Sequence, residues 1–347
     1  MELTGIVPPL ITPFDSDGGI DTRSLSRLVD YLIAGGVRGL FVLGSSGEAA
    51  SLDVEERTSV VRTVTATAAG RVPVLVGVID TSLRRIFTYL DMAKSLGASA
   101  VVALPTYYYQ TNQPEIVEFF RAIAHRSPLP LVAYNLPQMV GVSIEPDTVS
   151  QLAHEGTIGA IKDSSPDISR TREMLLATRD VPHFSVLTGL EMVVDLAVAM
   201  GVAGAVPGLA NVAPRQYVET FELARAGQME RARVIQEQLT TLFAITRQGR
   251  HAQSYSAEAL SGFKTGLKLL GVIATNRMHE PMQGLTAEDE ERVKTVMQRT
   301  GLLEPGAADA PGGIEPLPRP WVHRPRHRLL ARVAFAEGSS SACRSVL

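Results

Sequence analysis

Cysteine is nearly absent from this chain of 347 residues, and its charges almost cancel. The one cysteine, Cys343, excludes an intrachain disulfide and a metal cluster built on several thiolates. The seven histidines are scattered, and the close pair His323 and His327 lies in an arginine-rich stretch, so we expect no metal site. The formal net charge of -3 gives no bulk attraction toward nucleic acid or membranes. With 45% hydrophobic residues, the composition predicts a soluble globular protein with a large core.

The sequence has no clear targeting or membrane segment. Its first residues, Met1 to Gly5, lack the basic and apolar regions of a secretion signal, which favours a cytoplasmic protein. Residues 190–210 are apolar enough to imitate a membrane span, but Glu191, Asp195, three glycines and a proline interrupt them. We interpret this stretch as a buried helix followed by a buried strand.

Eight short apolar runs recur along the chain, with helical patterns between them. They are residues 5–7, 39–43, 72–78, 100–104, 130–134, 158–161, 184–187 and 204–206. From the second run to the seventh, successive strand ends lie 26 to 34 residues apart, the length of one strand-loop-helix unit. Continuous apolar runs are typical of parallel strands covered on both faces. An open doubly wound sheet gives similar runs, but a count of eight favours a (β/α)8 TIM barrel.

The rest of the chain divides into a helical part and a tail. Helical patterns over 214–226, 228–248, 256–270 and 287–299 exceed what a barrel needs. We therefore expect a barrel core over 1–212, and the last barrel helix with a C-terminal helical extension over 213–303. Residues 304–347 are rich in proline and arginine and predict a disordered tail, which we favour over a nucleic-acid patch.

Lys162 ends the sixth apolar run and is followed by Asp163, Ser164 and Ser165. In barrels the active site lies at the C-terminal ends of the strands. A lysine partly removed from water at that place can attack a ketone as a free amine, which is the chemistry of a Schiff-base enzyme. The alternative is a lysine paired with a carboxylate such as Asp163.

Two further strand ends carry groups that this chemistry would use. The second run leads into Gly44-Ser45-Ser46-Gly47-Glu48, where a tight turn with free N–H groups and hydroxyls would cradle a carboxylate or phosphate. Tyr134 ends the fifth run, and its hydroxyl can both donate and accept a proton. A plain strand-to-helix turn and a core tyrosine are the respective alternatives. Together with Lys162 they predict an aldolase acting on an α-keto acid.

These motifs resemble the family of pyruvate-dependent class I aldolases and lyases. That family includes N-acetylneuraminate lyase, dihydrodipicolinate synthase and 2-keto-3-deoxy-sugar-acid aldolases, and the resemblance covers about residues 3–300. The turn Gly44–Glu48 resembles its G-[ST]-[ST]-G-E motif, and Tyr134-Asn135-Leu136-Pro137 resembles Y-N-x-P. Residues 159–165 resemble its Schiff-base strand.

The resemblance implies a role for each matching residue. Lys162 would form the imine with pyruvate, and Tyr134 would be the general acid and base. Ser45 and Ser46 would hold the pyruvate carboxylate by backbone N–H and hydroxyl. Tyr108 matches a tyrosine that the family inserts across a subunit interface to complete a proton relay with Ser45 and Tyr134. This implies a homotetramer.

Other positions bear on the substrate. The resemblance places the backbone carbonyl of Val206 toward the pyruvate. Dihydrodipicolinate synthases have an arginine two residues after the proline of Y-N-x-P, and this chain has Met139, which cannot grip a carboxylate. Sialic acid lyases place two acids after the glycine of strand seven. In this chain Gly189 is followed by one acid, Glu191, so we expect a pocket less polar than that of a sialic acid lyase.

We therefore predict a lyase that makes or breaks a C–C bond next to pyruvate, with pyruvate and an aldehyde as its small-molecule partners. A 2-keto-3-deoxy sugar acid or related 4-hydroxy-2-oxo acid is the expected substrate. The covalent imine on Lys162 replaces any cofactor or metal. The alternatives are 4-hydroxy-tetrahydrodipicolinate synthase, which joins pyruvate and aspartate semialdehyde, a keto-acid dehydratase, and a non-catalytic barrel that binds a keto acid.

Overall fold

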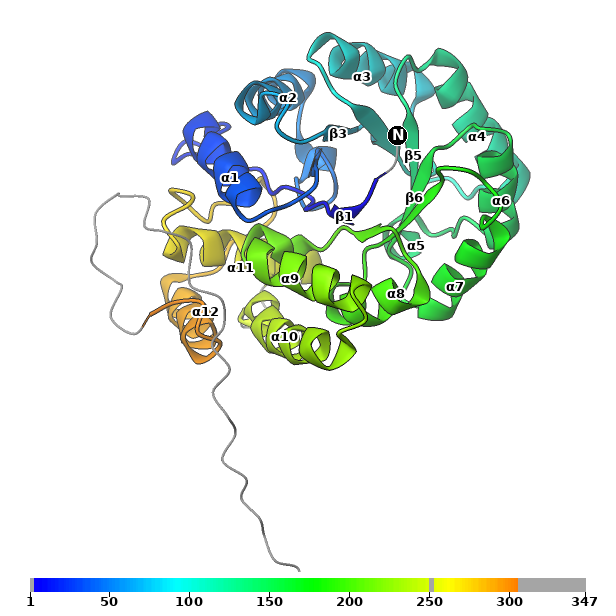
Figure 1. Cartoon of the computed structure of the whole chain (residues 1–347). Helices are drawn as coiled ribbons and strands as arrows, with labels where there is room; N and C mark the ends of the chain where they lie inside the picture. The colour runs from blue at the N-terminus through cyan, green and yellow to red at the C-terminus, as the bar shows by residue number, and fades with distance from the viewer. Residues whose placement is uncertain (1–2, 250–252, 305–347) are drawn as a thin grey trace, which may run out of the picture.

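The computed structural model describes residues 3–249 and 253–304, and its centre is a curled sheet of eight parallel strands (Figure 1). The strands are β1 (Gly5–Ile6), β2 (Leu40–Val42), β3 (Val74–Gly77), β4 (Ala100–Ala103), β5 (Leu131–Asn135), β6 (Ala160–Asp163), β7 (Ser185–Thr188) and β8 (Gly204–Ala205). Consecutive strands pair from β2 to β8, and β8 pairs with β1. A parallel bridge between Pro9 and Phe41 joins the chain after β1 to β2 and closes the ring. The predicted (β/α)8 barrel is confirmed.

Helices lie around the outside of this ring (Figure 1). The main ones are α1 (Thr22–Ala34), α2 (Val54–Ala68), α3 (Leu83–Ser95), α4 (Gln113–Arg126), α6 (Pro146–His154), α7 (Ile168–Ala177), α8 (Val194–Met200) and α9 (Pro214–Arg225). The sequence marks where two of these helices begin, because Asp53 before α2 and Asn112 before α4 each form a capping box with a glutamate three residues later. Parallel strands with helical crossovers bring all eight strand ends to one mouth.

The apolar stretch 190–210 forms helical turns and a strand, as expected. It contains the turn η2 (Glu191–Val193), then α8, β8 and the turn η3 (Gly208–Asn211). In the part of the chain that the structure describes, no helix is long and apolar enough to cross a membrane. Strands β5 and β6 extend past Tyr134 and Lys162 by one polar residue each, to Asn135 and Asp163.

Two apolar clusters fill the barrel. The larger one packs the outer faces of the strands against the helices. The smaller one fills the inside of the ring, where alternate strand residues point. Its members are Leu3, Val7, Phe41, Leu75, Ile79, Ala100, Val102, Leu104, Val132, Tyr134, Leu136, Ala160, Leu187 and Val206.

The C-terminal helical extension comprises α10 (Met229–Leu242), the turn η4 (Phe243–Arg247), α11 (Tyr255–Leu269) and α12 (Ala287–Arg299). α10 packs on α9, and α12 packs on α11 and η4, so these helices lie beside the ring (Figure 1). The predicted helix over 228–248 is divided into α10 and η4. The unit boundaries at 212 and 303 stay predictions, and the predicted tail lies outside the described residues apart from Glu304.

Candidate active site

Lys162 lies inside the ring with its amine against aromatic rings. It pairs in register with Tyr134 of β5 and Leu187 of β7. Its side chain is almost buried, and Nζ lies 4.0 Å from the centroid of the Tyr134 ring and 5.3 Å from that of Phe41. Within residues 3–249 and 253–304, no carboxylate forms an ion pair with Lys162. The amine is therefore held by apolar and aromatic contacts, and none of the described carboxylates lies close enough to form an ion pair with it.

Asp163 faces the other side of the strand, because neighbouring strand residues alternate. Its carboxylate is buried and accepts hydrogen bonds from Asn135 Nδ2 at 2.9 Å, Thr171 Oγ1 at 2.7 Å and Ser165 Oγ at 3.0 Å. The alternative interpretation of Lys162, a lysine paired with Asp163, is thus excluded. The hydrogen bond between Asn135 and Asp163 instead joins the ends of β5 and β6. It thereby fixes the positions of the neighbouring residues Tyr134 and Lys162.

The turn after β2 presents backbone N–H groups that have no hydrogen-bond partner among the described residues. Gly47 and Glu48 donate back to the carbonyls of Gly44 and Ser45, both at 3.1 Å. The backbone N–H groups of Ser45 and Ser46 make no hydrogen bond to any described residue, and both residues are at least partly exposed. A side chain at Gly44 would meet the Phe41 ring at 2.7 Å, so the glycine is required there. The turn can accept an anion such as a carboxylate.

The ends of β7 and β8 complete the surroundings of Lys162. Gly189 is so close that an added Cβ would lie 3.3 Å from Lys162 Cε and would collide with Ser164 Oγ. Val206 and Leu187 line the same narrow interior cavity as Lys162 and Phe41. The Val206 carbonyl accepts no hydrogen bond from the described residues. It is therefore available to a bound molecule.

Glu191 is engaged with the backbone that follows β8. Its Oε2 accepts a hydrogen bond from the N–H of Leu209 at 2.6 Å, and a side chain at Gly208 would lie 3.0 Å from Oε1. Burial raises the pKa of this carboxyl to about 7, although the backbone N–H groups of Leu209 and Gly208 and the charge of Lys162 favour its ionised form. The acid that sequence predicted for substrate binding therefore also holds the β8 turn.

The tyrosines predicted for a proton relay do not meet within one chain. Tyr134 is buried, but Tyr108 is 87% exposed and packs edge to face on Tyr109, with ring centroids 5.1 Å apart. No hydrogen bond among the described residues joins the hydroxyls of Ser45, Tyr134 and Tyr108. Met139, in the short helix α5 (Pro137–Val140), is also exposed at 53%.

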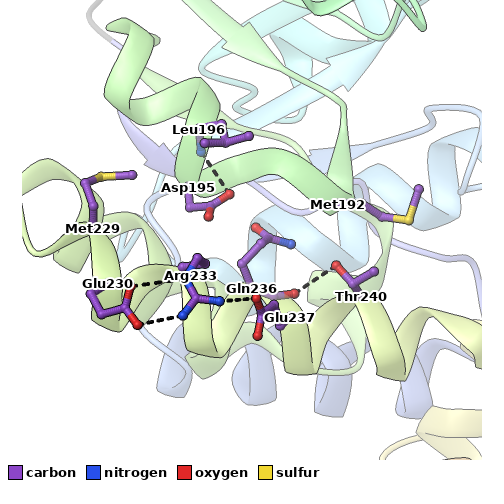
Figure 2. Close-up of a pocket in the computed structure, with 9 residues that line it drawn as sticks. All are labelled: Met192, Asp195, Leu196, Met229, Glu230, Arg233, Gln236, Glu237 and Thr240. Atoms are coloured by element: carbon purple, nitrogen blue, oxygen red, sulfur yellow. Dashed lines mark hydrogen bonds and ion pairs between the residues drawn. The ribbon is translucent and has the colours of Figure 1, made fainter. Parts of the chain in front are cut away.

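A groove on the outside of the barrel is distinct from this site (Figure 2). It lies along α8 and α10 and has a volume of about 370 Å³. In it Arg233 forms ion pairs with Glu230 and Glu237, and Met192 and Met229 supply apolar surface. It contains none of the predicted catalytic residues. In the described part of the chain, no group of three or more histidine, cysteine or acidic side chains is arranged to hold a metal.

Sequence reasoning missed three features of the site. Phe41 contacts the amine of Lys162, and only its alternate position in β2 signals that it faces inward. The polar network around Asp163 joins residues from two strands and α7, and no local pattern announces it. Arg57 is buried and donates to the carbonyls of Ala49, Leu52 and Ile79, which anchors the chain that follows the Ser45 turn.

A nearly buried lysine at the mouth of a (β/α)8 barrel, packed against a tyrosine and in no ion pair with a described carboxylate, is the arrangement of a class I aldolase. Residues 2–300 match the model of the dihydrodipicolinate synthetase family, and the chain belongs to that family. It is accordingly a pyruvate-dependent class I lyase, as predicted.

Similar proteins carry both synthase and aldolase names. The chain is 29% identical to "Probable 2-dehydro-3-deoxy-D-pentonate aldolase YjhH" of Escherichia coli, over 87% of this chain and 99% of that protein. A dihydrodipicolinate synthase structure from Bacteroides thetaiotaomicron is 36% identical with a TM-score of 0.81, covering 86% of this chain and 98% of that one. YagE, a prophage protein of Escherichia coli solved in complex with pyruvate, is 29% identical with a TM-score of 0.81, covering 87% and 99%.

Proposed function

We propose that this lyase cleaves or forms the C–C bond of a 4-hydroxy-2-oxo acid through an imine on Lys162. The observation that carries the proposal is the amine of Lys162, nearly buried, unpaired with any carboxylate of the described residues and 4.0 Å from the Tyr134 ring centroid. A lysine in a close ion pair is a poor nucleophile, and no carboxylate of the described residues forms such a pair with Lys162.

The chemistry follows from the groups around Lys162. The amine adds to the C2 ketone, and water leaves with a proton from the hydroxyl of Tyr134, which gives an iminium ion and the phenolate of Tyr134. Tyr134 takes the proton of the C4 hydroxyl, the C3–C4 bond breaks, an aldehyde leaves, and the bonding electron pair moves into the iminium to form an enamine. Protonation of C3 and hydrolysis then release pyruvate. Ser45 and Ser46 hold the carboxylate with their free N–H groups, and the Val206 carbonyl faces the bound acid.

For the aldehyde part, we propose a 2-keto-3-deoxy sugar acid. An arginine at position 139 would bind a second carboxylate, as aspartate semialdehyde requires, but the residue is an exposed methionine. Glu191, whose carboxyl interacts electrostatically with Lys162, offers a hydrogen-bonding group suited to a hydroxylated chain. Similarity to YjhH, whose name is that of a 2-dehydro-3-deoxy-D-pentonate aldolase, supports this substrate class, and similarity to a synthase structure keeps the synthase as the alternative.

We also propose that Tyr108 acts in a neighbouring subunit. A tyrosine that is 87% exposed beside a second exposed tyrosine is suited to insertion into a partner. The left-handed backbone of Tyr108, with φ of 83°, shows that its position is held against local preference. A homotetramer and a cytoplasmic location stay predictions.

Three reactions separate the candidate functions. The purified protein is incubated with 2-keto-3-deoxypentonate, and pyruvate and glycolaldehyde are measured. It is also incubated with pyruvate and aspartate semialdehyde, and the reaction with the sugar acid is examined for a product of water loss. We expect pyruvate and aldehyde in equal amounts. Faster condensation with aspartate semialdehyde would establish the synthase, loss of water without aldehyde would establish a dehydratase, and no turnover would support a binding protein.

A further inference from the structure

A second buried lysine lies behind the Ser45 turn. Lys264 belongs to α11 of the extension, and its Nζ lies 2.5 Å from Oε1 of Glu48, with both side chains fully excluded from solvent. Nζ also donates to the Arg277 carbonyl at 2.7 Å and lies 4.2 Å from the centroid of the Phe14 ring. The mechanism proposed above uses neither charge. A buried ion pair contributes little net stability compared with apolar residues of the same volume. Stability alone therefore does not explain why this pair is present.

Glu48 connects this pair directly to the free N–H groups. It is the last residue of the turn, has left-handed backbone with φ of 55°, and donates its N–H to the Ser45 carbonyl at 3.1 Å. Its second carboxylate oxygen, Oε2, accepts a hydrogen bond from the N–H of His279 at 2.8 Å. Both oxygens of Glu48 are thus held by residues of the extension, while its backbone closes the turn.

The opposite side of the turn is held by the chain that follows β1. Thr12 Oγ1 donates to the Gly47 carbonyl at 2.7 Å, and Phe14 packs edge to face on the His279 ring with centroids 5.6 Å apart. The His279 ring also lies 4.0 Å from the carboxylate of Glu56. The Glu48–Lys264 pair is therefore the charged contact at the centre of a packed junction between the turn and the extension.

We propose that Glu48 and Lys264 are positioning residues for the carboxylate of the keto acid. The pair fixes the turn against the extension, so that the N–H groups of Ser45 and Ser46 keep the spacing that a carboxylate needs. A misplacement of this anion site by about 1 Å would weaken binding and misalign the ketone, although no atom of the pair touches the substrate. This inference rests on the proposed function, because it assumes that Lys162 forms an imine with a keto acid.

The test compares two ketones that differ in the carboxylate. The protein is incubated with cyanoborohydride and limiting pyruvate or acetone, and the rate of adduct formation on Lys162 is followed by mass spectrometry. The variant E48Q/K264M removes both charges at nearly constant volume. The matched control is K268M/E290Q, since Lys268 lies one turn further along α11 and pairs with Glu290 at 2.6 Å in a more exposed place.

In E48Q/K264M we expect the ratio of pyruvate to acetone labelling to fall about 10- to 100-fold, with the acetone rate unchanged. The control should keep the wild-type ratio. An unchanged ratio, or an equal fall in both rates, would overturn the inference while leaving the proposed function intact. If E48Q/K264M does not fold, E48Q alone is measured with the same criteria. A wild-type protein that is not labelled on Lys162 would refute the proposed function and this inference together.

Discussion

Lys162 is nearly excluded from solvent and Lys264 is fully excluded, but the groups that surround the two amines differ in charge. Lys162 lies against the rings of Tyr134 and Phe41 with no carboxylate partner in the described residues. Lys264 lies 2.5 Å from Glu48, and burial nevertheless lowers its pKa to about 8 against the attraction of that carboxylate. Burial alone therefore does not make a lysine a nucleophile. The partner of the amine decides whether a lysine serves chemistry or holds two parts of the molecule together.

The largest expected effect is the loss of activity in Lys162→Met. Turnover should fall by about 10⁴-fold or more, because the imine cannot form. The free energy of unfolding should change by less than about 1 kcal/mol, since methionine suits the aromatic surroundings. Steady-state kinetics and urea unfolding of the same preparation measure both. Appreciable aldol cleavage by this variant would contradict the role of Lys162.

The same substitution at Lys264 should mainly affect the stability of the fold. Lys264→Met leaves Glu48 buried without its partner and should lower the free energy of unfolding by about 3–5 kcal/mol. Denaturant unfolding measures this, with Lys268→Met as the control, which should cost less than about 1 kcal/mol at its partly exposed pair. If Lys264→Met lowered the free energy of unfolding no more than Lys268→Met does, the distinction between Lys162 and Lys264 would not hold.

Tyr134→Phe separates imine formation from bond cleavage. Removing the hydroxyl should lower aldol cleavage by about 10²- to 10⁴-fold, because no group then takes the proton from the C4 hydroxyl. The ring that packs on Lys162 remains, so reductive labelling by pyruvate should persist. Cleavage assays and labelling assays on one preparation give the comparison. Equal losses in both would mean that Tyr134 acts mainly by placing the amine.

Tyr108→Phe should lower turnover by about tenfold without disturbing the fold, because the proposed relay loses a hydroxyl that does not touch the substrate. Tyr109→Phe, at the neighbouring exposed tyrosine, is the control and should keep its activity. Turnover and circular dichroism are measured for both, with the oligomeric state determined by light scattering. A fully active monomer would show that no partner's tyrosine is needed.

The smallest effect concerns Glu191 and pH. Its pKa of about 7 in the folded protein lies above the ordinary 4.5, so between these values the folded state holds a proton that the unfolded chain releases. Stability therefore falls as pH rises through this range, and Glu191→Gln should remove that part of the slope. Unfolding free energies at about pH 5 and about pH 8 test it. An identical slope in the variant would place the titration elsewhere.

The sequence predicted the barrel and Lys162 for one physical reason. Apolar runs mark the strands, and the residue that ends each run lies at the common mouth, so Lys162, Tyr134 and Val206 could be placed by counting along the chain. Bounds were off by a residue where Asn135 and Asp163 extend the strands with polar side chains that hydrogen-bond each other.

Contacts between distant segments could not be found in this way. Nothing near Glu48 or Lys264 indicates that they pair, because α11 reaches the β2 turn only through the packing of the whole extension. The hydrogen bonds of Glu191 to the β8 turn are likewise set by tertiary structure. A role for Tyr108 in another subunit leaves no trace in the periodicity of one chain.

Reductive labelling with pyruvate and cyanoborohydride, followed by peptide mapping, identifies the amine that forms the imine. If an unpaired amine in the barrel is the nucleophile, the pyruvyl adduct will form on Lys162, and the peptide that carries Lys264 will stay unmodified. An adduct on Lys264, or a folded protein with no adduct on Lys162, would contradict the assignment of Lys162 as the nucleophile.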